Sequence, residues 1–254
     1  MFGGSSGFGT VFSLSADGTG FRTLHTFAFT DSYAQSALLV SGNTLYGTIA
    51  YGGRSGTGRI FKVNTDGTSF ATLYSFSAFI TNSTGVYTNS DGNQPRGLIS
   101  WGNTLYGTAQ FGGSSDNGTV FTVNTNGTGF TILHSFSAGA SYGNCVYMYT
   151  NSDGVWPSGS GLIVSGSTLY GTAPYGGIGG SGTIFSISLP VSSPQLTIAP
   201  SGVNIILTWP TNAAGFTLQS APAITGSFTN LPGATSPYTN AITASQQYFR
   251  LVSP

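Results

Sequence analysis

The segment Leu-Tyr-Gly-Thr-Ala-Gln-Phe-Gly-Gly at residues 105–113, followed by Gly-Thr-Val-Phe at 118–121, decides the fold because the chain repeats it. A repeated unit of this kind is one supersecondary structure that buries its apolar surface against its neighbours. The sequence therefore predicts a repeat protein. Further copies lie at 45–48 with 58–61, at 169–172 with 182–185, and, for the second element alone, at 9–12.

The spacing and the alternation of apolar residues indicate the class of repeat. The Gly that opens the second element recurs after 49, 60 and 64 residues, a period typical of propeller blades rather than of short solenoid coils. In the third of four strand-like segments, Phe121 and Val123 share one face while Val120 begins the other. No segment has a helical period. We expect an all-β fold, a β-propeller-like array of four-stranded repeats that is small, open or incomplete, since three copies of Leu-Tyr-Gly-Thr are fewer than the four to eight blades of closed propellers.

The composition changes after the last repeat. Two prolines and small polar residues at 190–194 are typical of an extended linker. Residues 195–254 alternate apolar and polar side chains, which favours a small immunoglobulin- or fibronectin type III-like β-sandwich with Trp209 as its buried anchor. We therefore expect a repeat domain at 1–189, a linker at 190–194 and a sandwich at 195–254.

The charge content argues against several classes of partner. Only 5% of the residues are charged, and six basic residues balance six acidic ones, so there is no basic surface for nucleic acid. No apolar run approaches the length of a membrane span. Cys145 is the only cysteine, which excludes an intramolecular disulfide. We expect no nucleic-acid partner and no transmembrane segment in this chain.

The phrases Leu-Tyr-Gly-Thr-Ala, Gly-Gly, Gly-Thr-Val-Phe, Asp-Gly-Thr-Gly-Phe and Leu-His-Ser-Phe together resemble the GloVer (Gloeo/Verruco) tandem repeat of bacterial surface or secreted proteins, over about residues 1 to 189. The resemblance implies an extracellular or cell-surface location and a propeller-like array joined to a variable region; it implies no activity. Because residues 1–4 lack the features of a signal peptide and the chain begins within a repeat, we expect that an export signal is missing from a truncated amino terminus.

Most ionisable side chains recur with the repeat, which favours structural roles. Four of the six Asp residues precede Gly, as tight turns require. His25 and His134 occupy equivalent positions, with Tyr74 between them, and we interpret all three as packing residues. Two histidines and no glutamate make a clustered metal site improbable. The turn-building Asp residues are Asp17, Asp66, Asp91 and Asp153.

The connections between repeats, at 77–96 and 137–160, hold the strongest candidates for a ligand site. They absorb most of the growth in repeat length, and loops of this length in a compact domain are usually functional or disordered. Aromatic rings flanked by amides and carboxylates stack on sugar rings and bind hydroxyl groups, so we expect a glycan-binding rim. The alternative is that these aromatics cover the ends of the core. The candidate ligand-binding residues are Tyr87, Asn89, Asp91, Tyr142, Tyr147, Tyr149, Asp153 and Trp156.

The sequence favours a non-catalytic extracellular scaffold that binds glycans or cell-surface proteins. A first alternative is a polysaccharide-acting enzyme that uses Asp91 or Asp153, which would need two carboxylates facing one cleft. A second is a purely structural spacer without exposed aromatic patches. No cofactor is predicted, and Ca²⁺ held by the Asn and Asp oxygens of the loops remains a hypothesis, although their spacing is not that of an EF-hand.

Overall fold

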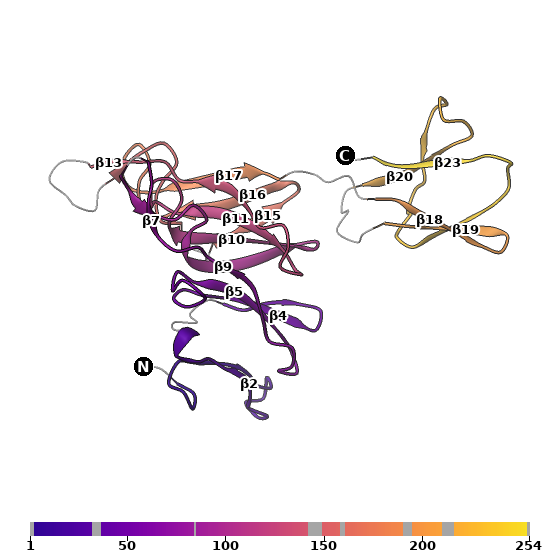
Figure 1. Cartoon of the computed structure of the whole chain (residues 1–254). Helices are drawn as coiled ribbons and strands as arrows, with labels where there is room; N and C mark the ends of the chain where they lie inside the picture. Colours follow the sequence, from indigo (N-terminus) through magenta and orange to yellow (C-terminus); the bar gives the residue numbers. More distant parts are fainter. Residues whose placement is uncertain are drawn as a thin grey trace. The chain divides into compact units, whose positions relative to one another are not determined.

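A computed structural model describes residues 3–31, 37–83, 85–141, 149–157, 161–189, 195–209 and 216–252. The chain forms two compact units, Met1–Ser188 and Leu189–Pro254 (Figure 1). All strand pairs of the named sheets are antiparallel, and the described residues contain the short 3-10 helix η1 (Phe29–Asp31) and no α-helix. The all-β prediction is confirmed. No helix in the described part of the chain is long and apolar enough to cross a membrane.

The repeats of the first unit fold as antiparallel meanders in which each strand pairs with the next one along the chain, as in a propeller blade. Two sheets hold the four strands that the sequence predicts, whereas the first copy holds two strands and the last holds three. The sheets are β1 (Thr10–Ser13) with β2 (Arg22–Thr26); β3 (Leu39–Ser41), β4 (Thr44–Ile49), β5 (Arg59–Asn64) and β6 (Ala71–Ser75); β9 (Asn93–Trp101), β10 (Thr104–Phe111), β11 (Thr119–Asn124) and β12 (Thr131–Ser135); and β15 (Ile163–Ser165), β16 (Thr168–Ala173) and β17 (Thr183–Ser188).

Two hairpins extend from the connections between these sheets. The first pairs β7 (Ile80–Thr81) with β8 (Tyr87–Thr88), and the second pairs β13 (Ala140–Ser141) with β14 (Tyr149–Thr150). The two long connections singled out in the sequence therefore carry short strands of their own.

Each Leu-Tyr-Gly-Thr element owes its glycine to a phenylalanine ring on the next strand. Gly107 on β10 pairs directly with Phe121 on β11, and a Cβ added at Gly107 would lie 2.5 Å from the ring of Phe121. Gly47 under Phe61 and Gly171 under Phe185 repeat this arrangement, with distances of 2.5 and 2.3 Å. A glycine on a strand thus makes room for a large buried ring opposite it.

The two middle sheets have two apolar faces, and each face packs against a different neighbour. On β10 and β11, Leu105 and Phe121 pack against Tyr46 and Ile60 of the preceding sheet; we call this side the backward face. The other side, the forward face, carries Tyr106, Thr108 and Val120, which alternate with the backward residues along the strands. The same contact joins β4 and β5 to the β1–β2 hairpin, where Leu45, Ile49, Phe61 and Val63 pack against Val11, Leu24 and Phe27.

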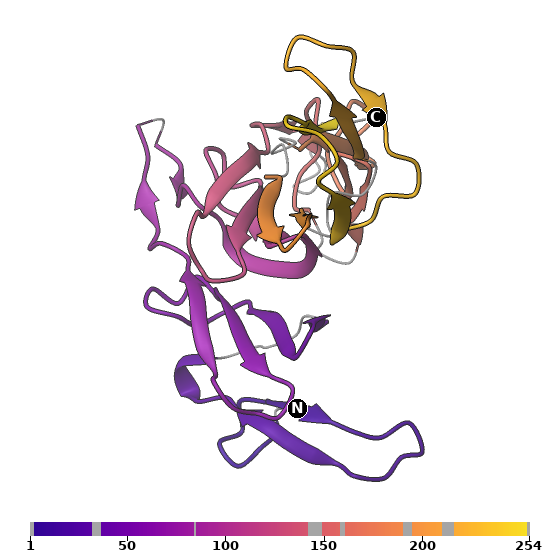
Figure 2. The same ribbon diagram turned by 90° about the vertical axis from the view of Figure 1, so that its right-hand side faces the viewer.

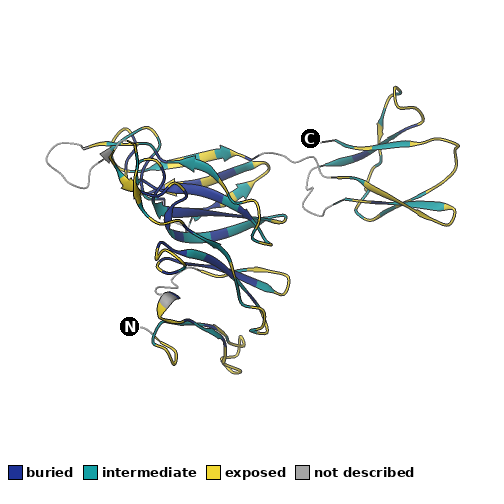
Figure 3. Ribbon diagram, viewed as in Figure 1, coloured by how far each residue is buried: buried dark blue, intermediate teal, exposed yellow. Residues whose placement is uncertain are grey.

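The sheets of the first unit follow one another in the order of the chain (Figures 1 and 2). Burial is greatest in the middle sheets, and exposed residues concentrate on the first and last ones (Figure 3). The second residue of the third strand, which lies on the forward face, illustrates this difference. Val120 is buried, whereas its equivalent Ile184 is 82% exposed. The forward face of β15–β17 therefore has no neighbour within the described first unit.

The turn between the third and fourth strands is built as the sequence predicts. Asp66 Oδ1 accepts hydrogen bonds from the backbone N and the Oγ1 of Thr68, at 2.8 and 2.6 Å. Asp17 and Asn126 hold Thr19 and Thr128 in the same way. The turn interpretation of Asp17 and Asp66 is confirmed.

The second unit contains two three-stranded sheets. Leu207 and Leu218, one from each sheet, are fully buried, whereas Trp209 is only partly buried. The prediction that Trp209 anchors this core was wrong, because smaller aliphatic side chains fill it. The predicted linker 190–194 lies outside the described residues. The sheets are β18 (Thr197–Ser201), β19 (Asn204–Thr208) and β22 (Tyr238–Ala241), and β21 (Thr229–Asn230), β20 (Thr217–Ala221) and β23 (Tyr248–Val252).

Candidate functional site

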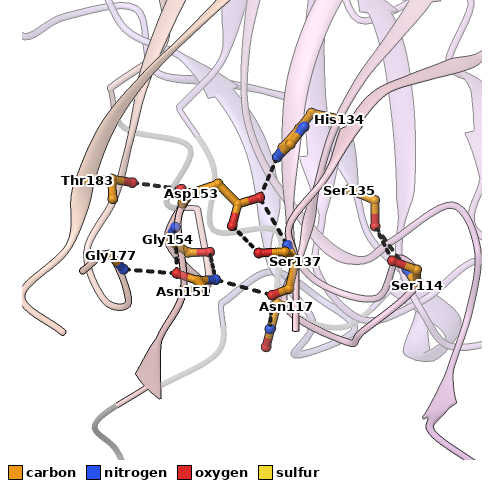
Figure 4. Close-up of polar contacts among 10 residues, drawn as sticks. All are labelled: Ser114, Asn117, His134, Ser135, Ser137, Asn151, Asp153, Gly154, Gly177 and Thr183. Atoms are coloured by element: carbon orange, nitrogen blue, oxygen red, sulfur yellow. Dashed lines mark hydrogen bonds and ion pairs between the residues drawn. The ribbon is translucent and has the colours of Figure 1, made fainter. Parts of the chain in front are cut away.

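Asp153 is the centre of a hydrogen-bonded cluster where the fourth strand of one repeat passes into the next repeat (Figure 4). Its Oδ2 lies 2.8 Å from His134 Nε2 and accepts a 3.0 Å bond from the backbone N of Ser137, while Ser137 Oγ donates to Oδ1. Its backbone oxygen accepts from Thr183 Oγ1 on β17. Asp153 thus connects the end of β12 to the following sheet.

Asn151 shapes the loop that presents Asp153. Its Oδ1 accepts hydrogen bonds from the backbone N of Gly154 and of Gly177, at 2.8 and 2.9 Å, and its Nδ2 donates to the backbone oxygens of Ser137 and Gly154. The amide, rather than the carboxylate of Asp153, therefore closes the local turn. Sequence analysis assigned the turn to the carboxylate; the structure shows that Asp153 bonds a residue 16 positions earlier in the chain.

Asp91 forms the same cluster one repeat earlier. Its Oδ2 accepts from Tyr74 Oη at 2.7 Å and from the backbone N of Ser77 at 2.8 Å, and its Oδ1 accepts from Ser77 Oγ at 2.5 Å. Asn89 Nδ2 donates to the backbone oxygens of Ser77 and Gly92. Asn89 and Asp91 are 1% and 7% exposed, so their side chains do not present ligand-binding groups at the surface.

Asp31 occupies the corresponding place in the first repeat, which sequence analysis missed. Its Oδ2 accepts from the backbone N of Ala28, the equivalent of Ser77, and its Oδ1 forms a 2.7 Å ion pair with Arg59 Nη2. The signal was present in the sequence, because Asp31 precedes Leu38 by seven residues, as Asp91 precedes Leu98. No glycine follows Asp31, and this concealed the match.

The residues at the His-Tyr-His position combine packing with hydrogen bonding. Phe70 stacks on His25 with ring centroids 3.6 Å apart, and Phe130 stacks on Tyr74 at 3.6 Å. The packing interpretation is confirmed for these two. His134 packs edge-on against Phe136 and bonds to Asp153, but no ring of the described residues stacks on its face as Phe70 and Phe130 do on theirs.

The environment of these clusters shifts several pKa values. Partial burial alone would raise the pKa of Asp153, but the hydrogen bonds from Ser137 and His134 outweigh burial and hold it below its ordinary value. Burial, assisted by the hydrogen bond to Asp91, raises the pKa of Tyr74. Burial lowers the pKa of His25, although the charge of Asp31 partly opposes this. At neutral pH the lowered pKa of Asp153 favours its charged form, and the raised pKa of Tyr74 favours its protonated hydroxyl.

The residues that follow the two acidic turns adopt a left-handed backbone that is rare outside glycine. Trp156 has φ of 56° and Gln94 has φ of 54°, and each N–H donates to a backbone oxygen of the preceding repeat, at Asn117 and Thr57. The prolines that come next pack against glycines of that preceding repeat, Pro157 on Gly118 and Pro95 on Gly58. This connection is therefore an architectural contact between repeats, and its left-handed position holds Gln94 in one copy and Trp156 in the next.

Trp156 uses this position to join an aromatic group from three segments. Its ring lies edge-on to Phe111 at the end of β10, with centroids 5.8 Å apart, and to Tyr175 after β16, at 5.4 Å. Phe111 and Trp156 are partly buried, and Tyr175 is 45% exposed. We call Phe111, Trp156 and Tyr175 the aromatic triad. The equivalent of Phe111 in the earlier repeat is Tyr51, which is exposed, and Gln94 takes the place of the tryptophan there.

The other predicted site residues are not brought to this triad. Tyr87 on β8 is exposed and stacks on Phe79 of its own hairpin. Tyr149 lies on β14, where its backbone pairs with Ser141. Tyr142 and Tyr147, like Cys145, lie outside the described residues.

The clusters do not form a site typical of metal or hydrolytic chemistry. No three His, Cys, Asp or Glu side chains gather in the described part of the chain. Among the described residues, the hydrogen-bond partners of Asp91 and Asp153 have no member in common. Hydrogen-bond donors surround both carboxylates, the opposite of a Ca²⁺ site, where oxygen ligands converge. The calcium hypothesis stays a prediction that titration calorimetry would test.

Several solved structures resemble this chain distantly. The chain is similar to a chain of a nidogen/laminin complex (18% identity, TM-score 0.43, covering 80% of this chain and 65% of that one). It is also similar to TolB from Acinetobacter baumannii (12% identity, TM-score 0.36, covering 78% of this chain and 44% of that one). A third similar structure is the Xanthomonas campestris gluconolactonase XC5397 (15% identity, TM-score 0.35, covering 79% of this chain and 62% of that one). The chain covers less than two thirds of each of these structures. At these TM-scores the resemblance assigns neither fold nor activity, and no curated protein matches.

The family comparison gives a definite result. The model of the Gloeobacter/Verrucomicrobia repeat matches residues 1–146, which include the first two Leu-Tyr-Gly-Thr elements and the three phrases that form β1–β2, β5–β6 and β11–β12. The third element lies beyond the match, yet it pairs Gly171 with Phe185 as the second pairs Gly107 with Phe121. Since the match covers more than half of the 254 residues, the chain belongs to the Gloeobacter/Verrucomicrobia repeat family.

Proposed function

We propose that the chain is a non-catalytic repeat scaffold of the bacterial cell surface or extracellular space, and that the aromatic triad of Phe111, Trp156 and Tyr175 binds saccharide rings. The aromatic triad is the observation that carries this proposal. It gathers three rings from three segments at the tip of a connection, and its members are partly accessible to solvent. Aromatic faces with a polar surrounding are suited to the apolar face of a sugar.

The backbone of Trp156 supports a binding role for its side chain. A left-handed conformation of a residue other than glycine costs about 1–2 kcal/mol, and the hydrogen bond to Asn117 together with the contact of Pro157 maintains it. Gln94 shares this conformation, so the strain belongs to the architecture. The architecture does not require the bulky indole, because Gln94 adopts the same backbone conformation in the earlier repeat.

Polar groups border the triad. Asp116 is partly buried in the loop that follows Phe111; burial raises the pKa of its carboxyl group, and the backbone N of Gly112 donates to it at 2.8 Å. Asn117, next in the chain, accepts from Trp156 through its backbone oxygen and donates to the backbone oxygen of Ser137 through Nδ2. The partly buried carboxyl group of Asp116 is the side chain of this loop that would orient a hydroxylated ligand.

The two alternatives receive less support. A spacer without a binding role would lack exposed aromatic side chains, whereas Tyr51, Tyr87 and Tyr175 are all exposed. A hydrolase would need two carboxylates facing one cleft, whereas the contacts of Asp91 and Asp153 belong to separate repeats. Measuring the release of reducing sugar by wild-type chain and by Asp153→Asn tests the enzymatic alternative, which predicts activity that the substitution abolishes.

Binding of the intact chain to an array of bacterial and plant polysaccharides tests the proposal. We expect a signal that Trp156→Ala reduces at least tenfold, because an aromatic anchor at the centre of an interface contributes about 2 kcal/mol or more and about 1.4 kcal/mol is a factor of ten in affinity. Tyr51→Ala is the matched control, since it removes the equivalent exposed ring where no tryptophan accompanies it, and should leave binding unchanged. An array without signal, or equal loss in both variants, would refute the saccharide site.

The location is tested separately. Fractionation of a bacterium that carries the gene should find the chain in the culture medium or on the outer surface. Recovery from the cytoplasm alone would contradict the proposed location and leave the binding measurement unaffected.

A further inference from the structure

The last sheet of the first unit lacks the strand that completes the two middle sheets. β6 pairs with β5 and β12 with β11, whereas β17 forms the edge of its sheet in the described residues. The fourth strands share the pattern Phe-x-x-Leu-x-x-Phe, at 21–27, 70–76 and 130–136. After β17 the chain continues with Leu189 and the proline-containing residues 190–194, which do not have this pattern.

Two side chains lack the cover that a fourth strand provides elsewhere. Phe61 and Phe121 are fully buried, and Phe70 and Phe130 stack on them at 5.5 Å. Their equivalent Phe185 is only partly buried. His134 likewise has no ring stacked on it in the described residues, and its side chain is 38% exposed. A single phenylalanine at the start of a fourth strand would cover both.

The β1–β2 hairpin contains such a phenylalanine. Phe21 is 64% exposed and stacks only on the equally exposed Phe12, in the geometry that Phe70 and Phe130 adopt on their partners. Two-stranded sheets are marginally stable on their own. β2 therefore has the residues of a complete fourth strand, Phe21, Leu24 and Phe27, in a sheet to which residues 3–31 contribute two strands.

β1 and β17 are interchangeable partners for β2. β1 reads Thr-Val-Phe-Ser and β17 begins Thr-Ile-Phe-Ser. Val11 pairs with His25 and Phe12 with Thr23 across a bulge, the same register and bulge that join β5 to β6 and β11 to β12. In β17, Ile184 and Phe185 occupy the places of Val11 and Phe12, so β2 would meet the same hydrogen-bonding edge.

We propose that two copies of this chain assemble by exchange of one strand pairing, in which β17 of each copy replaces β1 as the partner of β2 in the other. Phe21 of the second copy then covers Phe185 and stacks on His134, as Phe70 stacks on His25. β2 keeps its contact with β3–β6 of its own copy. The backward face of that sheet therefore covers the forward face of β15–β17 of the other copy. Ile163, Tyr170 and Ile184, which are exposed at present, become buried by the contact that already joins the internal sheets.

The number of sheets in residues 1–254 fits a closed assembly. Each copy of these residues contributes β3–β6, β9–β12 and β15–β17 completed by β2 of its partner, so two copies supply six four-stranded sheets. Closed propellers hold four to eight blades, and residues 1–254 closing on themselves would supply three. Head-to-tail contacts that close after two copies give a ring with twofold symmetry.

Paired cysteine substitutions in a Cys145→Ser background test the exchange. Arg22 on β2 faces Ser13 on β1, and in the exchanged pairing it faces Ser186 on β17. Directly paired strand residues lie within reach of a disulfide. We expect Arg22→Cys/Ser186→Cys to oxidise to a dimer of twice 26.0 kDa, with a peptide linking positions 22 and 186 in mass spectrometry.

The matched control shares one of these cysteines. Ser13→Cys/Arg22→Cys locks β2 to β1 within one chain and should give a monomer by light scattering, while reduction should restore the dimer. A cooperative thermal unfolding transition of the locked variant shows that it is folded.

Three results would overturn the proposal. The first is that the unmodified chain is a monomer at its highest soluble concentration. This result counts against the proposal whether the edge of β17 is exposed to solvent or covered by the second unit. The second is a dimer that persists in the locked variant, which would show association without exchange. The third is a link between positions 22 and 186 within one chain, or open assemblies larger than a dimer.

Discussion

The four-stranded sheet β9–β12 and the three-stranded sheet β15–β17 carry nearly the same sequence in their shared strands, yet the first is buried on both faces and the second on only one. Tyr106 and Val120 on the forward face of β9–β12 are 5% and 0% exposed, whereas Tyr170 and Ile184 on β15–β17 are 37% and 82% exposed. The strands themselves pair in the same register. The sheet motif therefore specifies a meander with two apolar faces, and a neighbouring repeat decides which of them become core.

Removing the ring above the glycine gives the largest expected difference between the two repeats. Phe121→Ala should lower the free energy of unfolding by about 3–5 kcal/mol, the cost of a large cavity in a full core. Phe185→Ala should cost clearly less, because the ring is only partly buried. Denaturant unfolding of both variants measures this. Equal losses would show that the third repeat is as tightly packed as the second.

Adding a methyl group under the same rings tests the comparison from the opposite direction. Gly107→Ala should destabilise by about 1–3 kcal/mol through overpacking, since the new Cβ would meet the fully buried Phe121. Gly171→Ala meets a ring with solvent on one side, which has room to move, and should cost less. The measurement is the denaturation midpoint at constant slope; a larger loss at Gly171 would contradict the expectation.

The Asp clusters should differ in the same sense. Tyr74→Phe removes the 2.7 Å bond to the buried Asp91 and should cost about 1.5–3 kcal/mol, the range for a hydrogen bond to a charged group. His134→Phe removes the 2.8 Å bond to Asp153, but water reaches this more exposed cluster, so the loss should be smaller. Thermal unfolding at pH 7 compares the two. A more damaging His134→Phe would mean that the bond is not replaced by water.

Acid should weaken the molecule in two steps, the smallest of the expected effects. Because burial lowers the pKa of His25, the folded state favours the neutral ring, and stability should fall as the pH drops below about 6.5, where the unfolded ring gains its proton. The pKa of Asp153 is also lowered, so its contribution is present above about 4 and is lost as the pH falls below that value. His25→Phe should remove the first step alone in melting curves against pH. An unchanged curve would refute the assignment.

The sequence predicted the repeating sheets well because each strand has its own alternation of apolar and polar residues. The turn between the third and fourth strands also has its own Asp or Asn residue. Trp156 was selected among eight candidates for its aromatic character, and the structure gives it two aromatic neighbours. Its partners Phe111 and Tyr175 were missed, since both belong to the motif itself and therefore appeared structural. Asn89 and Asp91 were selected for polarity, but polarity in a loop does not reveal that both side chains are buried and that they bond to Tyr74, Ser77 and Gly92.

The two faces of each sheet give the array a direction. A backward face fits only a forward one, so a duplicated unit inserted at any internal point would find a matching surface on either side, without a single new contact having to evolve. Genes for such chains are thus free to lengthen and shorten by recombination between copies. The tips that carry Gln94 and Trp156 are then the positions where each new copy acquires an individual character.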